Sequence, residues 1–292
     1  MADPSSQSPQ YVSIVEMAPR DGLQNEKQVV ETDAKVTLVD MLSDCGFERI
    51  EVTSFVSPKW VPQLADAAEV MARIRRRPEI RYSVLTPNMK GFEAARAAAA
   101  DEMAIFASAS ESFSRQNINC SIAESIERFR PVAETARDCD IPLRGYVSCV
   151  VECPYEGAIP PENVASVALR LKKLGCYEIS LGDTIGRGDP EAVERMLATV
   201  LEYIPASMLA GHFHDTSGRA LENIDVALEY GLRVFDASVA GLGGCPYAPG
   251  AKGNVDTLSV DRHLKAKGFE TGLSAERLER AAAFARTLRS AS

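Results

Sequence analysis

Short apolar or alternating runs recur along the chain at intervals of about 30 residues, and each precedes a longer segment rich in alanine, glutamate and arginine. Apolar runs of this length are typical of strands, whereas the longer segments have the period of amphipathic helices. The pattern predicts eight strands, at residues 12–17, 49–53, 80–85, 102–107, 143–150, 178–181, 208–214 and 234–239. It predicts helices at 32–45, 61–76, 90–100, 121–138, 161–174, 190–203 and 218–230.

The predicted strands and helices alternate in a single run, which is typical of a (β/α)8 barrel. Some helices begin with favoured residues, such as Thr32 before Asp33, and Pro190 at a first helical position. A doubly wound open sheet would normally have fewer strands and a glycine-rich first turn, whereas residues 17–22 read Met-Ala-Pro-Arg-Asp-Gly. We therefore expect an α/β fold, a single (β/α)8 TIM barrel over residues 11–292 with a short C-terminal helical extension.

Composition limits the protein class. With 292 residues, of which 46% are hydrophobic, the chain can bury a sizeable core. A net charge of −9 and an isoelectric point near 5.1 disfavour nucleic-acid binding, which needs a basic face.

Segment 1–10 is polar and lacks arginine, so we expect a disordered tail rather than a signal or transit peptide. No apolar run is long enough to span a membrane. Seven scattered cysteines without Cys-x-x-Cys spacing favour a reducing compartment, and we expect a cytoplasmic protein.

In a barrel of this kind, the active site lies at the carboxyl ends of the strands and in the loops that follow. Polar and ionisable residues occupy several of these ends, and we expect them to converge on one mouth of the barrel. They are Arg20 and Asp21 after the first strand, Glu51 and Thr53 on the second, Asp183 and Thr184 after the sixth, His212 and His214 on the seventh, and Cys245 and Asn254 after the eighth.

Two of the three histidines, His212 and His214, lie one residue apart on a predicted strand. Strand alternation directs both imidazoles to one face, where they could bind a metal ion or could instead be buried, hydrogen-bonded histidines. Asp21 could add an oxygen ligand suited to Mg²⁺, Mn²⁺, Co²⁺ or Zn²⁺, or could cap a helix or turn. Two histidines and a carboxylate also occur in non-haem iron oxygenases, for which we would expect a different fold. His263 is expected at the surface.

Arg20 and the segment 240–254 offer further candidate chemistry. Arg20 keeps its charge and could stabilise an enolate oxygen, or it could form a structural ion pair. Segment 240–254 is dense in glycine and proline, which is typical of a mobile loop over the barrel mouth. Its Cys245 is either a bystander or an acid/base thiol, and Asn254 is either a turn residue or a metal ligand through its carbonyl oxygen.

Five stretches of the sequence are distinctive: APRDGLQNEK at 18–27, EVTSFVSPKWVP at 51–62, NINCS at 117–121, SLGDTIG at 180–186 and SVAGLGGCPY at 238–247. With them the chain resembles, from about residue 12 to 275, the 3-hydroxy-3-methylglutaryl-CoA lyase family, part of a superfamily of metal-dependent, pyruvate carboxyltransferase-like barrels. The last stretch, with its cysteine, looks like the signature that separates these lyases from isopropylmalate and homocitrate synthases.

The resemblance implies roles for the residues at matching positions. The metal ligands would be Asp21, His212, His214 and Asn254, the catalytic residues Arg20, Cys245, Asp183, Glu51 and His212, and the substrate contacts Arg20, Gln24, Thr184 and Asn117. The resemblance also implies a divalent cation, Mg²⁺ or Mn²⁺, as cofactor, an acyl-CoA substrate and a homodimer. For the CoA arm, Asn88, Lys90 and 108–119 follow the third and fourth strands and are either binding residues or ordinary polar loop residues.

The implied reaction is the retro-Claisen cleavage of 3-hydroxy-3-methylglutaryl-CoA into acetyl-CoA and acetoacetate, as in leucine degradation and ketone-body formation. One alternative is a Claisen-type synthase that joins acetyl-CoA to a 2-oxoacid, and another is a lyase for a related hydroxyacyl-CoA. Cys245, and a chain that ends soon after the barrel, favour the lyase over the synthase. A degenerate barrel that only binds CoA or metal would be expected to lack Arg20, Asp21 or a histidine, and none is missing.

Overall fold

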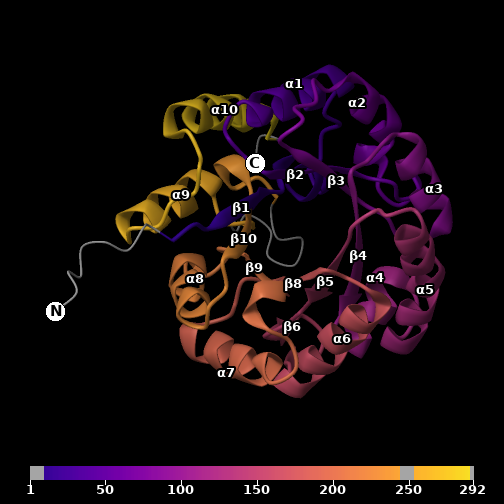
Figure 1. Ribbon diagram of the computed structural model, residues 1–292, viewed down its shortest axis with the longest axis vertical. Coiled ribbons are helices and arrows are strands. Elements are labelled where there is room, and N and C mark those ends of the chain that lie inside the picture. The colour runs from indigo at the N-terminus through magenta and orange to yellow at the C-terminus, as the bar shows by residue number, and fades with distance from the viewer. Residues whose placement is uncertain (1–9, 244–252, 290–292) are drawn as a thin grey trace.

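The computed structural model describes residues 10–243 and 253–289, whose strands include one closed parallel barrel (Figure 1). The barrel strands are β1 (Ser13–Glu16), β2 (Arg49–Ser54), β3 (Arg81–Leu85), β4 (Glu102–Ser108), β5 (Leu143–Ser148), β8 (Glu178–Asp183), β9 (Leu209–Phe213) and β10 (Val234–Ala237). Their order is β1-β10-β9-β8-β5-β4-β3-β2, and the pairing of β1 with β10 closes the barrel. The predicted strands and the (β/α)8 barrel are therefore confirmed.

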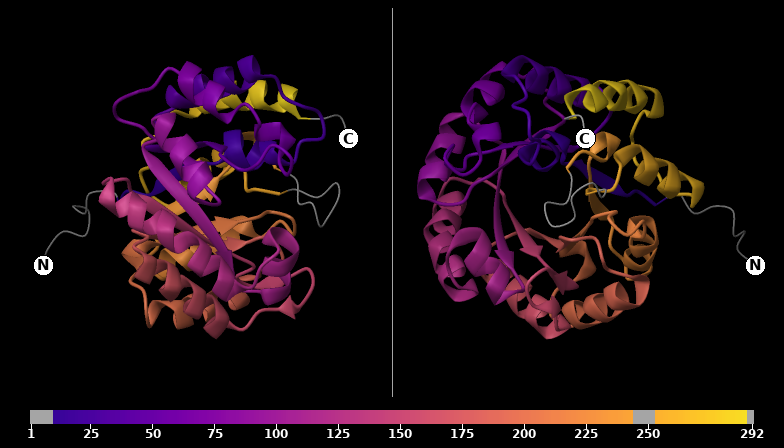
Figure 2. Two further views of the ribbon diagram at one scale, coloured as in Figure 1. Left: turned by 90° about the vertical axis from the view of Figure 1, so that its right-hand side faces the viewer. Right: turned by 180° about the vertical axis from the view of Figure 1, so that it is seen from behind.

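Helices surround the barrel on the outside (Figures 1 and 2). They are α1 (Thr32–Ser43), α2 (Ala67–Arg73), α3 (Met89–Ala97), α5 (Ile122–Asp138), α6 (Pro161–Leu174), α7 (Pro190–Leu201), α8 (Ala220–Glu229), α9 (Thr257–Ala266) and α10 (Ala275–Leu288). The predicted C-terminal extension is two helices, α9 and α10, and α10 packs against α1. The last helices thus complete the outer ring beside the first one.

The structure departs from the predicted elements in three places. Helix α2 begins at Ala67 rather than at residue 61, because Pro62–Leu64 forms a separate 3-10 turn, η2. A helix, α4 (Glu111–Ile118), and a small hairpin of β6 (Glu152–Cys153) and β7 (Gly157–Ala158) were not predicted, because both are short insertions in loops at the carboxyl ends of strands. The proposed tail lies outside the described residues apart from Gln10, whose carbonyl accepts a hydrogen bond from Glu270.

The two faces of the barrel sheet have different surroundings. The main apolar cluster includes residues from both strands and helices, whereas a second, small cluster consists of Val15, Met17, Leu85, Ala104 and Tyr146. Charged residues on the same strands, among them Arg144 and Asp236, are almost fully buried. Buried charges are unfavourable unless they are paired, so these groups must bond to one another. Within the described residues, no helix has the length and apolar composition needed to cross a bilayer.

Candidate active site and metal centre

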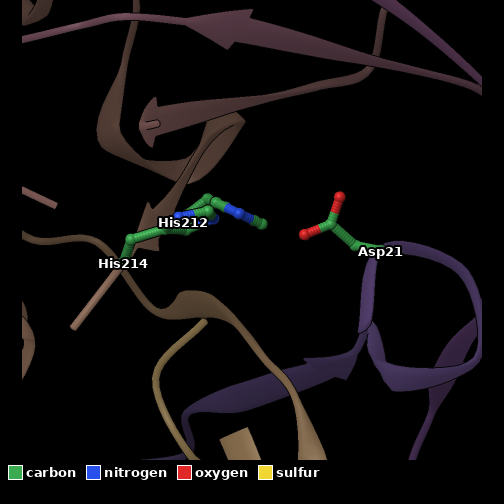
Figure 3. Close-up of side chains that lie close together, drawn as sticks. All are labelled: Asp21, His212 and His214. Atoms are coloured by element: carbon green, nitrogen blue, oxygen red, sulfur yellow. The ribbon is translucent and has the colours of Figure 1, made fainter. Parts of the chain in front are cut away.

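The structure brings Asp21, His212 and His214 together at the carboxyl ends of the strands. One ligand atom from each lies within 4.8 Å of the other two. Figure 3 shows the carboxylate of Asp21 directed across the barrel mouth toward the two imidazoles. His212 belongs to β9, His214 follows that strand, and Asp21 comes from the turn after β1. The predicted convergence of these three side chains is therefore confirmed.

A tight turn after β1 fixes the direction of Asp21. The π-helical turn η1 (Ala18–Gly22) is closed by the carbonyl of Met17, which accepts hydrogen bonds from the amides of residues 20, 21 and 22. Glycine is needed at the end of this turn, because a Cβ at Gly22 would lie 2.8 Å from Leu242 Cβ and 2.9 Å from Ser238 Oγ. Close packing against the segment after β10 thus holds the turn in place.

His212 is oriented by a buried carboxylate that the sequence analysis did not identify. Its Nδ1 lies 3.1 Å from Asp236 Oδ2, and Ser180 Oγ donates to the same oxygen at 2.7 Å. Burial acts to raise the pKa of Asp236, but the Arg144 guanidinium and His212 hold it well below its usual range. Because Asp236 is ionised, it favours a proton on Nδ1 of His212, which leaves Nε2 as the nitrogen that could bind a metal.

His214 has the chemistry of a metal donor. Burial lowers its pKa to about 4, and the neighbouring His212 ring lowers it in the same direction, so the imidazole is neutral at pH 7. Its Nδ1 is buried and has no hydrogen-bond partner among the described residues. A neutral imidazole with a buried, unpaired nitrogen fits a metal site, since burial without a partner is otherwise unfavourable.

Asp21 supplies the negative charge of this cluster. Burial acts to raise its pKa, but Arg20 and, more weakly, the two histidines hold it well below its usual range. Arg20 Nη1 donates to Asp21 Oδ1 at 2.5 Å, and Asn254 Nδ2 donates to Oδ2 at 2.7 Å. An ionised carboxylate beside two imidazoles gives the mixed oxygen and nitrogen donor set that divalent cations accept.

Asn254 lies against the cluster, as the sequence predicts for a fourth ligand. It forms an isolated antiparallel bridge with His214, and it is 3% exposed. Its backbone amide donates to the carbonyl of Gly243, and its side-chain amide also donates to Leu242 O at 3.2 Å. With both side-chain N–H groups used, the carbonyl oxygen is the atom that could serve as a ligand. Cys245 lies outside the described residues.

Arg20 lies beside the cluster, held by a second carboxylate. Its Nε and Nη2 donate to the two oxygens of Glu51 at 3.1 and 3.2 Å, and the guanidinium lies 5.7 Å from the ring centroid of Tyr146. Glu51 is completely buried and also accepts a 2.5 Å hydrogen bond from Tyr146 Oη. Glu51 therefore positions Arg20 and has no place among the three clustered ligands.

Asp183 and Thr184 organise the turn after β8. Asp183 is in register with Phe213, on the strand face opposite to Gly182 and His212. Its carboxylate accepts hydrogen bonds from the amides of Arg187 and Gly188, and burial raises its pKa to about 6 despite these bonds. Thr184 Oγ1 accepts a 2.8 Å hydrogen bond from the amide of Cys149.

The remaining predicted residues are more dispersed. Gln24 is half-buried just beyond η1, and Asn117 is exposed on α4. Asn88 caps α3, where its side chain accepts a 3.0 Å hydrogen bond from Gly91, and Lys90 is exposed. His263 is half-buried rather than freely exposed, since its Nε2 lies 2.7 Å from Asp225 on α8.

Three inward-facing residues of the site were missed: Asp236, Arg144 and Tyr146. Each lies within a predicted strand, and Arg144 donates to both of the others. The available signal was an ionisable or hydroxyl-bearing side chain in the middle of an otherwise apolar strand. Such a residue is unfavourable there unless a neighbouring strand supplies a partner.

Comparisons with known proteins agree with this arrangement. The sequence model of the HMGL-like family matches residues 11–285. A chicken (Gallus gallus) protein, "Hydroxymethylglutaryl-CoA lyase, mitochondrial", is 57% identical over 270 residues, covering 92% of this chain and 91% of the relative, and a mouse (Mus musculus) relative is named a cytoplasmic enzyme of the same kind.

Two solved structures extend the likeness to the fold. The HMG-CoA lyase from Brucella melitensis superposes with a TM-score of 0.95 and 65% identity, covering 96% of this chain and 99% of that one. The HMG-CoA lyase from Acinetobacter baumannii, in complex with coenzyme A and 3-methylmalate, has a TM-score of 0.90 and 38% identity over 95% of this chain and 91% of that one. The chain therefore belongs to the HMGL-like family.

Proposed function

We propose that this protein is a lyase that cleaves 3-hydroxy-3-methylglutaryl-CoA into acetyl-CoA and acetoacetate. The observation that carries the proposal is the cluster of Asp21, His212 and His214 with Arg20 bonded directly to Asp21. This cluster combines a candidate cation site with a fixed positive charge, which is what C–C cleavage to an enolate needs. The names of relatives that match more than nine-tenths of the chain support the same activity.

Asp21, His212, His214 and the carbonyl oxygen of Asn254 would hold a divalent cation, for which we propose Mg²⁺ or Mn²⁺. The ionised carboxylate of Asp21 and the neutral imidazole of His214 support this assignment. When bound, the cation supplies Lewis-acid polarisation of substrate oxygens. The Asp236 carboxylate keeps His212 in the tautomer that a cation requires.

Arg20 would stabilise the negative charge that develops on the thioester oxygen. Breaking the C–C bond moves its electron pair into the acetyl-CoA enolate, so a rigid cation near that oxygen lowers the barrier. Arg20 is 6% exposed and is fixed by Glu51 and Asp21, so it need not reorganise during the reaction. Glu51 accordingly assists catalysis by holding Arg20.

Two protons move in this reaction. The substrate hydroxyl would lose one, and the enolate carbon would gain one from the Cys245 thiol. Of the two candidate bases, Asp183 and His212, the histidine has its Nδ1 bonded to Asp236 and its Nε2 assigned to the cation, which favours Asp183. The pKa of about 6 supports Asp183, although its oxygens also bind backbone amides. The pH profile of kcat for Asp183→Asn tests this base: loss of the acidic limb near pH 6 assigns the proton to Asp183, and an unchanged limb removes Asp183 from this role.

The acyl-CoA would contact the rim of the barrel mouth through Arg20, Gln24, Thr184 and Asn117. The half-buried Gln24 and the exposed Asn117 offer free surface for such contacts. Alanine variants of Gln24 and Asn117 are expected to raise KM for the thioester with little change in kcat. An unchanged KM would remove the residue from the binding site.

The direct test is product formation from 3-hydroxy-3-methylglutaryl-CoA with Mg²⁺ or Mn²⁺, before and after chelation. We expect acetyl-CoA and acetoacetate only when the cation is present. Cleavage that persists after chelation would overturn the metal site. Release of CoA thiol from acetyl-CoA and a 2-oxoacid, without any cleavage, would instead favour the synthase, and cleavage of only a related hydroxyacyl-CoA would change the substrate.

We also propose a homodimer and a cytoplasmic location. The dimer rests on the family resemblance, and the location rests on the free thiols of the six described cysteines, which suit a reducing compartment. Sedimentation of the purified protein tests the dimer, and a monomer at micromolar concentration would contradict it. Cell fractionation tests the location, since relatives carry both cytoplasmic and mitochondrial names.

A further inference from the structure

Arg144 is a fully buried arginine near the amino end of β5, whereas the proposed metal ligands lie at the carboxyl ends of the strands. It is 1% exposed, and all three of its guanidinium nitrogens donate hydrogen bonds to buried groups. We propose that Arg144 is a positioning residue that holds both halves of the site, His212 on one side and Arg20 on the other. The inference rests on the proposed function, because those two residues have distinct tasks in it.

The first branch runs from Arg144 to His212. Arg144 Nη2 donates to Asp236 Oδ1 at 2.7 Å, and Nη1 donates to Oδ2 at 3.2 Å, so the guanidinium holds this carboxylate with two bonds. The same Oδ2 lies 3.1 Å from His212 Nδ1. A carboxylate held in this way fixes both the ring plane and the tautomer of the histidine.

The second branch runs from Arg144 to Arg20. Arg144 Nη1 donates to Tyr146 Oη at 2.8 Å, and that hydroxyl donates onward to Glu51 Oε2 at 2.5 Å. Glu51 in turn binds Arg20 with both oxygens. The ring of Tyr146 also lies between the two guanidinium groups, 5.0 Å from Arg144 and 5.7 Å from Arg20.

A fourth hydrogen bond fixes Arg144 itself. Its Nε donates to Glu178 Oε1 at 2.7 Å, and Arg49 donates to the same oxygen at 2.7 Å from the amino end of the barrel. Glu178, Tyr146 and Asp236 therefore surround one planar guanidinium on three sides. A lysine has donors at only one nitrogen and cannot reproduce these three directions, so the arrangement requires arginine.

The two branches give separable predictions for single variants. Asp236→Asn interrupts only the first branch and is expected to raise the Mn²⁺ dissociation constant about 10- to 100-fold. Tyr146→Phe interrupts only the second branch and is expected to lower kcat at saturating metal while the Mn²⁺ dissociation constant stays within about twofold of wild type. Arg144→Lys interrupts both and is expected to show both effects.

Arg49→Lys is the matched control, because Arg49 shares Glu178 with Arg144 but bonds to neither Asp236 nor Tyr146. Mn²⁺ binding is measured by paramagnetic resonance on substrate-free protein, so this readout stands even if the substrate assignment fails. Arg144→Lys with metal affinity and kcat within about twofold of Arg49→Lys would overturn the proposal. If Arg144→Lys does not fold, the two single variants decide: a Mn²⁺ dissociation constant in Asp236→Asn, or a kcat in Tyr146→Phe, within about twofold of Arg49→Lys would overturn the proposal.

Discussion

Glu16 is a fully buried carboxyl group at the end of β1 and ties the first turn to the last part of the chain. Its Oε1 accepts hydrogen bonds from the amides of Ala18 and Val239, both at 2.9 Å, and its Oε2 accepts one from Thr257 Oγ1 at 2.8 Å. Burial raises the pKa of Glu16 to about 7, although these hydrogen bonds act in the opposite direction. The group therefore titrates near neutrality without touching the proposed metal ligands.

Glu16→Gln is expected to stabilise the protein at pH 8 relative to wild type. The pKa of Glu16 is higher in the folded protein than its usual value of 4.5, so its contribution to stability is complete below pH 4.5 and is lost as the pH rises through about 7. Glutamine does not ionise, so the variant should avoid this loss in the free energy of unfolding, which amounts to about 3 kcal/mol in the wild type. Urea denaturation from pH 4 to 8 measures the difference. The exposed Glu48→Gln variant is the control, and the same pH-dependent difference there would contradict the assignment.

Cys245→Ala is expected to lower kcat by about 100-fold or more, because a positioned proton donor contributes that much. Metal content should stay unchanged, since the thiol is not among the proposed ligands. Rapid mixing with substrate and metal analysis by mass spectrometry measure the two quantities. Cys139→Ala, at the carboxyl end of α5, is the control and should retain full activity. A fully active Cys245→Ala would remove the thiol from the mechanism.

The sequence predicts the cluster of Asp21, His212 and His214 because two local rules suffice: side chains alternate along a strand, and strand ends in a barrel share one mouth. The residues behind the cluster depend on which strands are neighbours. Asp236 reaches His212 only because β10 pairs with β9, and Arg144 reaches Asp236 only across the barrel interior. Hydrophobic periodicity carries no information on such cross-barrel partners.

At the scale of elements, strands were easier to predict than the loops that join them. The barrel strands are mostly buried, and their boundaries agree with the sequence pattern to within a few residues. Helix α4 and the β6–β7 hairpin have fewer than nine residues each and lie within loops, so their apolar periods are too short to recognise. The shortened start of α2 follows from Pro62, which closes a 3-10 turn first.

Gly243→Ala tests whether the turn after β10 supports the site. Gly243 has a φ of +98°, and a Cβ there would lie 2.7 Å from Asn254 Nδ2 and 3.2 Å from the carbonyl of Asp21. We expect a loss of about 1 kcal/mol of stability from the left-handed backbone and, in addition, weaker Mn²⁺ binding from the displaced Asn254.

Gly175→Ala is the matched control for this turn. Gly175 has a similar φ of +106° at the end of α6, but nothing lies within 4 Å of a Cβ at that position. Its substitution should reduce stability to a similar extent and leave the Mn²⁺ dissociation constant unchanged. Equal losses of metal affinity in the two variants would show that the effect comes from global destabilisation.

At the scale of the whole molecule, the proposed ligands lie on both sides of the seam where β1 meets β10. Asp21 follows β1, and His212, His214 and Asn254 belong to the last third of the chain. A cation held by these residues should raise the unfolding temperature, because it binds only the folded state. At a metal concentration 100 times the dissociation constant, the gain is about 2.7 kcal/mol.

Differential scanning calorimetry with Mn²⁺ and then with a chelator measures this gain, which should be roughly 5 °C for a chain of this size. Asp21→Asn should reduce the metal-dependent shift, whereas His263→Gln, which alters a histidine of α9 that contacts Asp225 on α8, should retain it. A shift that persists in Asp21→Asn would mean that the cation stabilises the protein from another position.

The β1–β10 seam also sets an order of events during synthesis. Ser13 pairs with Val234, so the barrel stays open on the ribosome until more than 220 residues have been made. The site cannot assemble before that moment, because its ligands meet only across the closed seam. A cation bound there would connect the two ends of the barrel sheet. Bringing these ends together costs chain entropy, and the binding free energy of the cation would offset part of that cost. Nascent chains should therefore be unable to bind the cation, and the finished protein should gain both closure and its catalytic centre in one step.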